Sequence, residues 1–252
     1  MNCNNVNITG TTPGSGDIDF YLAVAKGDFT GYSRVSKFGL NESVPTTFES
    51  VWEESSVYPW PSSAGVVTVT SSSSNDTNSS GTGARTLTIE GLDASHNLLS
   101  ETVNMNGTGN VVTSGSFYRV FRMSVITAGS LETNAGKITA TISGTTVATI
   151  TAGNGQTLMA VYTVPAGKTA YIVNFNFSSS KDQEMHYRIR TKNGTTNAAW
   201  QIKEYVTCRG GFNDFVKRAI NSVAEKTDID MQAKAQSTST ASGGFELILI
   251  DN

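Results

Sequence analysis

The chain has 252 residues, a length that permits one large all-β domain or two smaller ones. Only 15% of its residues are charged and 38% are hydrophobic, so Ser, Thr, Asn and Gly carry most of the polar surface, as in chains of strands and turns. The formal net charge of −3 and the absence of a basic run argue against a nucleic-acid partner. No apolar run is long enough to span a bilayer, so we expect no membrane partner.

The first 17 residues are polar, rich in Asn and Gly, and without hydrophobic periodicity. They predict a flexible N-terminal arm over residues 1–17. This start has neither the basic nor the apolar region of a secretory signal, so we expect synthesis in a cytoplasm. Cys3 and Cys208 lie far apart with no CxxC spacing, which predicts two unrelated thiols.

In the first half of the chain, alternation of apolar and polar residues predicts β-strands. The segments that show it are 18–25, 64–71, 86–91, 99–104 and 117–126. The loop GLDASHN between two of them predicts a hairpin. Residues 46–60 lie around Pro45, Pro59 and Pro61, and they suit turns or an edge strand better than a central strand. The polar run 71–83 predicts a long surface loop or a boundary between subdomains.

In the second half, short apolar runs alternate with Gly, Asn and Pro. They predict strands over residues 137–142, 147–150, 156–164, 169–177, 183–191, 200–208, 228–235 and 244–251. Residues 165–168 predict a tight turn and Asn193-Gly194 a hairpin corner. Residues 213–226 fit a short helix or an irregular extended segment. Short, regularly spaced strands predict an all-β, antiparallel, jelly-roll-like β-sandwich over residues 18–252; an alternative divides this body near residue 128 into two β subdomains.

No residue pattern predicts catalysis, a cofactor or a metal site. The two histidines, His96 and His186, fall in a loop and on a strand, and a catalytic histidine needs a positioned partner. Asp76 and Asp93 stand in turn-like contexts, where Asp commonly hydrogen-bonds its own backbone. The segment TVPAGKT lacks the first glycine and the following helix of a phosphate loop. We therefore expect a protein without enzymatic activity.

Aromatic residues offer the single candidate contact surface. Trp52, Trp60 and Trp200 suit buried packing better than sugar binding, because each ring hides a large area. Tyr58 and Trp60, which flank Pro59, form the best candidate for an exposed aromatic patch. Such a patch would serve as a contact for a protein or glycan partner.

Several stretches of the chain resemble virion structural proteins of tailed bacteriophages, especially those of marine and cyanobacterial phages. They are DFYLAVAKGDFTGYSRVSKFG (19–39), SSSSNDTNSSGTGARTLTIEGLDASHN (71–97), FYRVFRMSVITAG (117–129), GNGQTLMAVYTVPAGKTAYI (153–172), EKTDIDMQAKA (225–235) and GFELILIDN (244–252). They are spread in order along the chain from residue 19 to residue 252, and they are motifs of fold. The chain departs from the family in the extra residues 1–17 and in the lack of proline in FVKRAINSVA.

The resemblance implies an all-β, non-enzymatic, oligomeric component of a virion. One role that fits is that of a capsid decoration (cement) protein, which would sit on the shell as a homotrimer in contact with the major capsid protein or other virion proteins. The low charge of the surface also suits self-association. Two alternatives stay open, a tail-associated protein (adaptor, fibre base or receptor-binding head) and a carbohydrate-binding module.

Overall fold

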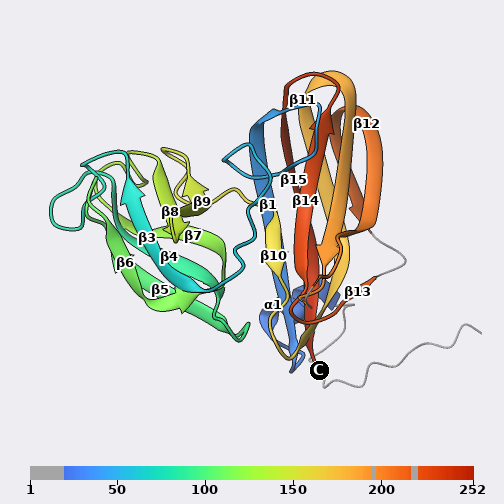
Figure 1. Cartoon of the computed structure of the whole chain (residues 1–252), viewed down its shortest axis with the longest axis horizontal. Helices are drawn as coiled ribbons and strands as arrows, with labels where there is room; N and C mark the ends of the chain where they lie inside the picture. Colours follow the sequence, from blue (N-terminus) through green and yellow to red (C-terminus); the bar gives the residue numbers. More distant parts are fainter. Residues whose placement is uncertain (1–19, 195–196, 217–220) are drawn as a thin grey trace, which may run out of the picture.

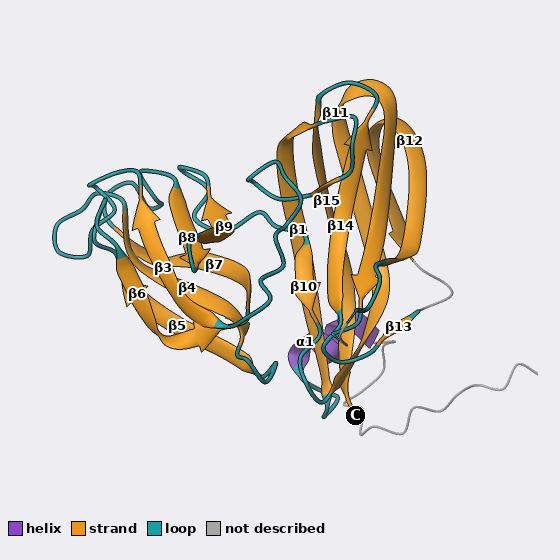
Figure 2. Ribbon diagram, viewed as in Figure 1, coloured by secondary structure: helices purple, strands orange, loops and turns teal. Residues whose placement is uncertain are grey.

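The computed structural model describes residues 20–194, 197–216 and 221–252. It confirms the all-β fold class: the described residues form fifteen strands and one short helix. The strands pair antiparallel in sheets of eight, four and three strands. They make up two β units that stand beside each other (Figures 1 and 2). The arm predicted for residues 1–17 lies outside the described residues.

The larger unit holds the eight-stranded sheet and the helix. Its elements are α1 (Phe20–Lys26), β1 (Tyr32–Val44), β2 (Glu49–Ser50), β10 (Val161–Thr163), β11 (Lys168–Lys192), β12 (Gln201–Val216), β13 (Ser222–Val223), β14 (Asp228–Ala235) and β15 (Ser239–Asp251). The smaller unit is built from the intervening chain. Its strands are β3 (Gly65–Ser71), β4 (Ala84–Leu92), β5 (Leu98–Asn104), β6 (Val111–Phe117), β7 (Arg119–Ala128), β8 (Ile138–Ile142) and β9 (Thr145–Ile150).

The 25-residue strand β11 is the centre of the larger unit. Its first half pairs with β15 as far as Ser179, and its second half pairs with β14 from Met185 onward. Between these halves the strand folds back on itself. The ring of Tyr187 therefore stacks on that of Phe177, with ring centres 4.4 Å apart, and the hydroxyl of Tyr187 donates to the carbonyl of Ser178. The two halves therefore lie in opposite layers, and β12 follows both as their neighbour. One sheet thus encloses its own core.

The core of that sandwich is made of alternate residues from β11, β14 and β15. Phe177, Tyr187, Met231 and Phe245 are buried there. Around Phe177 and Tyr187 on β11, buried residues alternate with more exposed ones, which is the period-two pattern that the sequence shows, whereas nearly all of β14 is buried. The strand predicted over residues 244–251 is confirmed as part of β15, which lies between β1 and β11.

The smaller unit is a second sandwich with its own core. Sheets in the order β6-β3-β8-β9 and β5-β4-β7 pack Val69, Leu87, Met123, Ile138 and other apolar residues between them. The chain enters this unit after β2 and leaves it before β10, so the unit is an insertion in the larger one. A division near residue 128 does not describe it, because β7 and β8, on either side of that position, share one core.

The strand predicted over residues 18–25 is wrong where it is described, because residues 20–26 form helix α1. Val24, three positions after Tyr21, packs with it against Val173 and Ile248 on the outer face of the sheet. Gly27, at φ +79°, then ends the helix. Its N–H donates to Val24, and the next N–H donates to the carbonyl of Ala23. This glycine cap was the helix signal in the sequence.

Other elements differ in extent. The strand predicted over residues 117–126 is interrupted at Tyr118, and of residues 156–164 only Val161–Thr163 form a strand. The strands predicted over 169–177 and 183–191 are one strand, β11. The described part of residues 213–226 holds the end of β12 and the short β13, with no helix. Propensity did not reveal these features, because they depend on which strands pair.

The polar run 71–83 is a loop, as predicted, but no boundary, because β3 and β4 on either side belong to the same unit. It is organised around the buried carboxylate of Asp76. One oxygen accepts hydrogen bonds from the backbone N–H groups of Ala84 and Ala135 at 2.7 Å. The other accepts from Gly136 N–H at 2.9 Å and from the hydroxyl of Ser71 at 2.5 Å. Asp76 thus joins segments that are about sixty residues apart.

We expect Asp76→Asn to destabilise the smaller unit by about 3 kcal/mol, because its amide NH₂ would face backbone donors that need an acceptor. Urea unfolding followed by tryptophan fluorescence measures this, since Trp52 packs in the core of that unit. Asp93→Asn is the matched control. Asp93 accepts bonds from Ser95 and Asn97 in an exposed turn that an Asn side chain can also form. Equal stability losses in the two variants would contradict this role of Asp76.

Candidate functional site

The structure places Tyr58 and Trp60 at the joint between the two units, so the prediction that they form an exposed patch is wrong for Tyr58. Tyr58 is 2% exposed, and its hydroxyl donates to the carbonyl of Val120. Burial raises the pKa of that hydroxyl. The ring of Trp60 is half-buried and packs between Tyr58 at 4.9 Å and Trp200 at 5.3 Å. Prolines around these residues suggested exposure, but the rings fill the space where the two units meet.

A buried ion pair crosses the same joint. The guanidinium of Arg119 on β7 donates two hydrogen bonds, of 3.0 and 2.9 Å, to the carboxylate of Asp228 on β14. Both side chains are 7% exposed. Thr163 donates a further bond to Asp228 at 2.6 Å, and Arg119 also donates to the carbonyl of Pro61. Although burial lowers the pKa of Arg119, the bonds and charge of Asp228 raise it more. These hydrogen bonds offset the cost of removing the two charges from water.

Further contacts extend the joint along β1. The ammonium of Lys37 is buried and donates to the carbonyl of Phe121 on β7. Burial, reinforced by the charge of Arg122, holds the pKa of Lys37 well below its usual value. Arg122 in turn donates to the carbonyl of Ser36 at 2.8 Å. The smaller unit therefore covers this edge of the larger sandwich.

The two histidines lie in different surroundings. His96 sits in the loop after β4 and contacts Tyr118 edge-on, with ring centres 5.0 Å apart; burial and the charge of Arg119 lower the pKa of His96. His186 lies on β11 with both ring nitrogens engaged, Nε2 with Glu184 at 2.8 Å and Nδ1 with the hydroxyl of Tyr205 at 2.9 Å. The structure does not bring the two imidazoles into one site.

The described part of the chain shows no group of three or more His, Cys, Asp or Glu side chains placed to hold a metal ion. It also holds no helix of the length and apolarity needed to cross a membrane. Asp93, the second aspartate noted in the sequence, closes its own turn. Slight burial raises its pKa, but hydrogen bonds from Asn97 and Ser95 lower it more.

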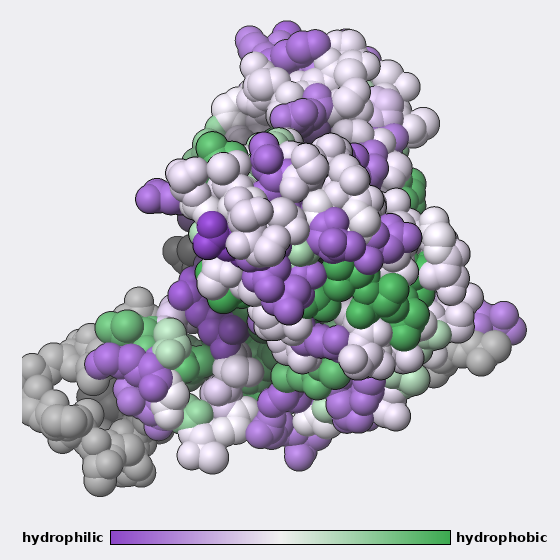
Figure 3. Space-filling model, turned by 90° about the vertical axis from the view of Figure 1, so that its left-hand side faces the viewer, coloured by the Kyte–Doolittle hydropathy of each residue, from purple (hydrophilic) through white to green (hydrophobic). Residues whose placement is uncertain are grey.

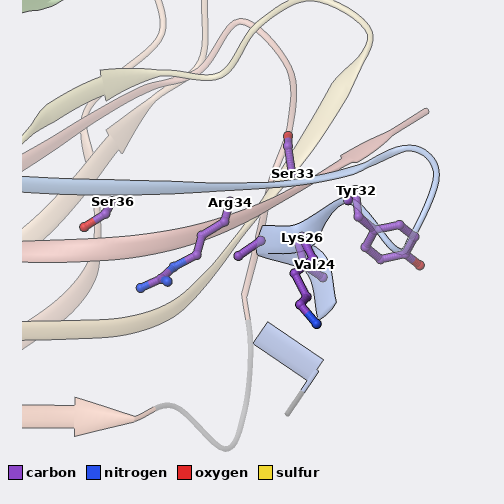
Figure 4. Close-up of a pocket in the computed structure, with 8 residues that line it drawn as sticks. Val24, Lys26, Tyr32, Ser33, Arg34 and Ser36 are labelled. Carbon is purple, nitrogen blue, oxygen red and sulfur yellow. The ribbon is translucent and has the colours of Figure 1, made fainter. Parts of the chain in front are cut away.

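One exposed apolar surface lies at the end of the larger unit, around α1. Phe20, Leu22 and Tyr32 are each more than a third exposed there. A hollow of about 620 Å³ opens beside them, between α1 and the first residues of β1. Figure 4 shows Arg34 and Lys26 on one side of the β1 ribbon and Ser33 on the other. This end of the sandwich thus combines exposed rings with two basic side chains.

A second exposed surface is the edge strand β12. Among the described strands it pairs with β11 alone, and none of its residues 201–215 is buried. Its exposed large apolar residues are Ile202, Tyr205, Phe212 and Phe215, and Phe212 is 70% exposed. An edge strand of this length presents a row of unpaired backbone groups, which soluble monomers usually protect. In the view of the molecule from the side where the smaller unit lies, apolar patches alternate with polar and neutral residues (Figure 3).

Sequence reasoning identified the strand over residues 200–208 but not its exposure. Period-two alternation shows which residues share a face, and it does not show whether a strand lies in the middle of a sheet or at its edge. The sequence did contain a signal of this exposure. Charged and aromatic residues are mixed on both faces of QIKEYVTCRGGFNDF, and neither face is consistently apolar.

Comparison with known proteins does not assign this chain to a family. No protein-family model matches it, and no curated protein sequence matches it either.

We expect Asp228→Asn to lower the free energy of unfolding by roughly 3–5 kcal/mol, because Arg119 would remain buried without a counter-charge. Chemical denaturation of the full chain measures the loss. The matched control is Asp182→Asn, which breaks the pair with Arg209 whose side chains are 84% and 76% exposed. Breaking that pair should leave stability unchanged within error. A small effect of Asp228→Asn would show that the ion pair does not hold the units together.

A pH prediction follows from Asp230, which bonds Arg190 at 2.8 Å at the same joint. Burial raises the pKa of its carboxyl to about 6, against the lowering effect of Arg190. The folded chain then binds this proton more tightly than the unfolded chain, so the contribution of Asp230 to stability falls as pH rises from about 4 to 7. Denaturation of the wild type and of Asp230→Asn across this range checks it. The difference in stability, wild type minus variant, should decrease with rising pH; a constant difference would refute the shift.

Proposed function

We propose that the protein is a non-enzymatic structural component of a tailed-bacteriophage virion, and that it is a capsid decoration (cement) protein. In this proposal it sits on the shell as a homotrimer, in contact with the major capsid protein. The observation that carries the proposal is the open edge of β12, with no buried residue from 201 to 215 and four exposed apolar side chains. A protein that acts by assembling needs a surface of this kind.

The position of the other edge supports self-association through β12. On the β1 side, the smaller unit of the same chain covers the larger unit through the contacts of Lys37, Arg119 and Arg122. Among the described elements of the larger unit, β12 keeps a long edge that no other strand covers. Neighbouring copies that bury this edge would satisfy its backbone groups and hide the rings of Phe212 and Phe215 at once.

The resemblance to phage virion proteins gives the proposal its biological setting. It rests on the stretches quoted from the sequence, which run from α1 to β15. The all-β fold agrees with the class that this resemblance implies, but the same architecture serves many other roles. The surface of β12, rather than the fold, supports the proposal.

We expect the purified chain to have a mass near three times 26.7 kDa in light scattering at micromolar concentration. Phe212→Glu should reduce it to the monomer mass, because a charge in the buried centre of an interface is costly. Ile126→Glu is the matched control: Ile126 is also exposed, at 58%, but lies on β7 of the smaller unit. A monomeric wild type, or equal dissociation of both variants, would refute self-association through β12.

The place on the particle is tested by labelling intact virions with an antibody against this chain and viewing them by electron microscopy. We expect label over the whole shell. Label confined to the tail or to one vertex would support instead a tail-associated protein, for which the exposed rings of Tyr205 and Phe212 would be host-contact candidates. Absence of the chain from purified virions would reject both roles.

A further inference from the structure

The outer face of the second layer of the larger unit carries a cluster of basic and aromatic side chains. We call it the β11 cluster: Phe48, His186, Arg188, Tyr205 and Lys234. Strand register places its members in adjacent rows. His186 on β11 lies opposite Lys234 on β14, and Arg188 lies opposite Tyr205 on β12. Phe48, from the chain just before β2, lies over them and contacts Tyr205 edge-on at 6.1 Å.

Two cations of this cluster have no carboxylate partner among the described ion pairs. Arg188 stacks on Phe48 with its guanidinium carbon 3.8 Å from the ring centre, and two of its nitrogens donate to the neutral side chain of Gln232. The ammonium of Lys234 lies 5.5 Å from the same ring. Arg190, the next outward-facing residue of β11, has its charge balanced by Asp230. Arg188 is therefore held in place while its charge stays unneutralised.

The electrostatics favour the arrival of an anion. Burial and the neighbouring charge of Arg190 lower the pKa of Arg188 more than the charge of Asp230 raises it, so a positive charge at this guanidinium is disfavoured. An anion placed beside Arg188 and Lys234 would offset this penalty with charge-assisted hydrogen bonds. Because packing against Phe48 and bonding to Gln232 already orient the guanidinium, little side-chain freedom would be lost on binding.

A pocket of about 260 Å³ adjoins these cations. Its walls are Thr46, Glu184, His186, Lys234, Ala235 and Gln236. His186 is held on both sides, by Glu184 and by Tyr205, and the ring of Tyr205 is 48% exposed. The pocket thus offers hydrogen-bond acceptors and donors on one side and an aromatic surface nearby. Except for Ala235, the walls of this pocket are polar or charged, so it suits a ligand that forms many hydrogen bonds better than an apolar one.

We propose that the β11 cluster binds an acidic saccharide, with the acid group of the sugar between Arg188 and Lys234. Hydroxyl groups of the sugar would bond Glu184, Thr46 and Gln236, and its C–H face would pack on Tyr205 by dispersion. The carboxylate of Glu184 decides between ligands, because it accepts bonds from hydroxyl groups but repels a ligand that carries many negative charges. A sugar with one acid group and several hydroxyls fits this combination better than an acidic peptide does. The proposal does not depend on a virion role.

Isothermal titration calorimetry of the full chain tests the proposal. The probes are tetrasaccharides that contain glucuronic, galacturonic or sialic acid, each with its methyl ester as a matched neutral ligand. At least one acid form should bind at millimolar concentration, and its ester should bind about tenfold more weakly or not at all. Failure of every acid form to bind, or equal binding of acid and ester, would overturn the proposal. Tighter binding of an oligoglutamate peptide would assign the surface to a protein partner and overturn it too.

Matched variants locate the site. Arg188→Gln and Lys234→Gln should each weaken binding by about tenfold. Lys203→Gln, which removes an exposed charge from the neighbouring strand β12, should leave binding unchanged. Similarly, Tyr205→Ala should weaken binding, whereas Leu98→Ala, at an exposed position on β5 of the smaller unit, should not. Circular dichroism confirms that each variant is folded, and Lys234→Gln keeps the test valid if Arg188→Gln unfolds. Equal losses in Lys203→Gln and Lys234→Gln would show non-specific attraction and overturn the proposal.

Discussion

The pairing of β11 is the constraint on which the larger unit depends. A single strand of 25 residues contributes to both layers, with β15 beside its first half, β14 beside its second half and β12 along both. Because it folds back at residues 180–183, its inward residues face one another across the core, as Phe177 and Tyr187 do. The outward residues of its second half are then left in one row, which is where the β11 cluster arises.

The inserted unit changes what the larger sandwich exposes. An open sandwich has two sides where strand edges are free, and each is a liability for association. The smaller unit covers the β1 side through the contacts of Lys37 and Arg122 and the buried pair of Arg119 with Asp228. The cost of burying the Arg119–Asp228 pair is offset by the hydrogen bonds between its members and those from Thr163 and to Pro61. What the insertion leaves uncovered is the side formed by β12.

Two surfaces therefore stand apart from an otherwise well-satisfied fold. The edge of β12 exposes apolar rings beside unpaired backbone, and the neighbouring face holds Arg188 and Lys234 without a counter-charge. A sequence selected for stability alone would be expected to place a carboxylate near Arg188 and polar residues along β12. Local conflicts of this kind usually mark functional surfaces. The two surfaces share Tyr205, so assembly through β12 and ligand binding beside it would influence each other.

The sequence by itself determined the all-β class, most of the strands, the hairpin of β4 and β5, and the turn that Asp93 closes, because these depend on residues close in the chain. It also contained the signal for α1, in Gly27, which alternation concealed. Only the tertiary structure decided the return of β11, the insertion of the smaller unit and the burial of Tyr58. It also decided the meeting of Phe48, Arg188 and Lys234. Each of these requires pairing between distant strands, and a period of two shows which residues share a face without showing which strand lies beside it.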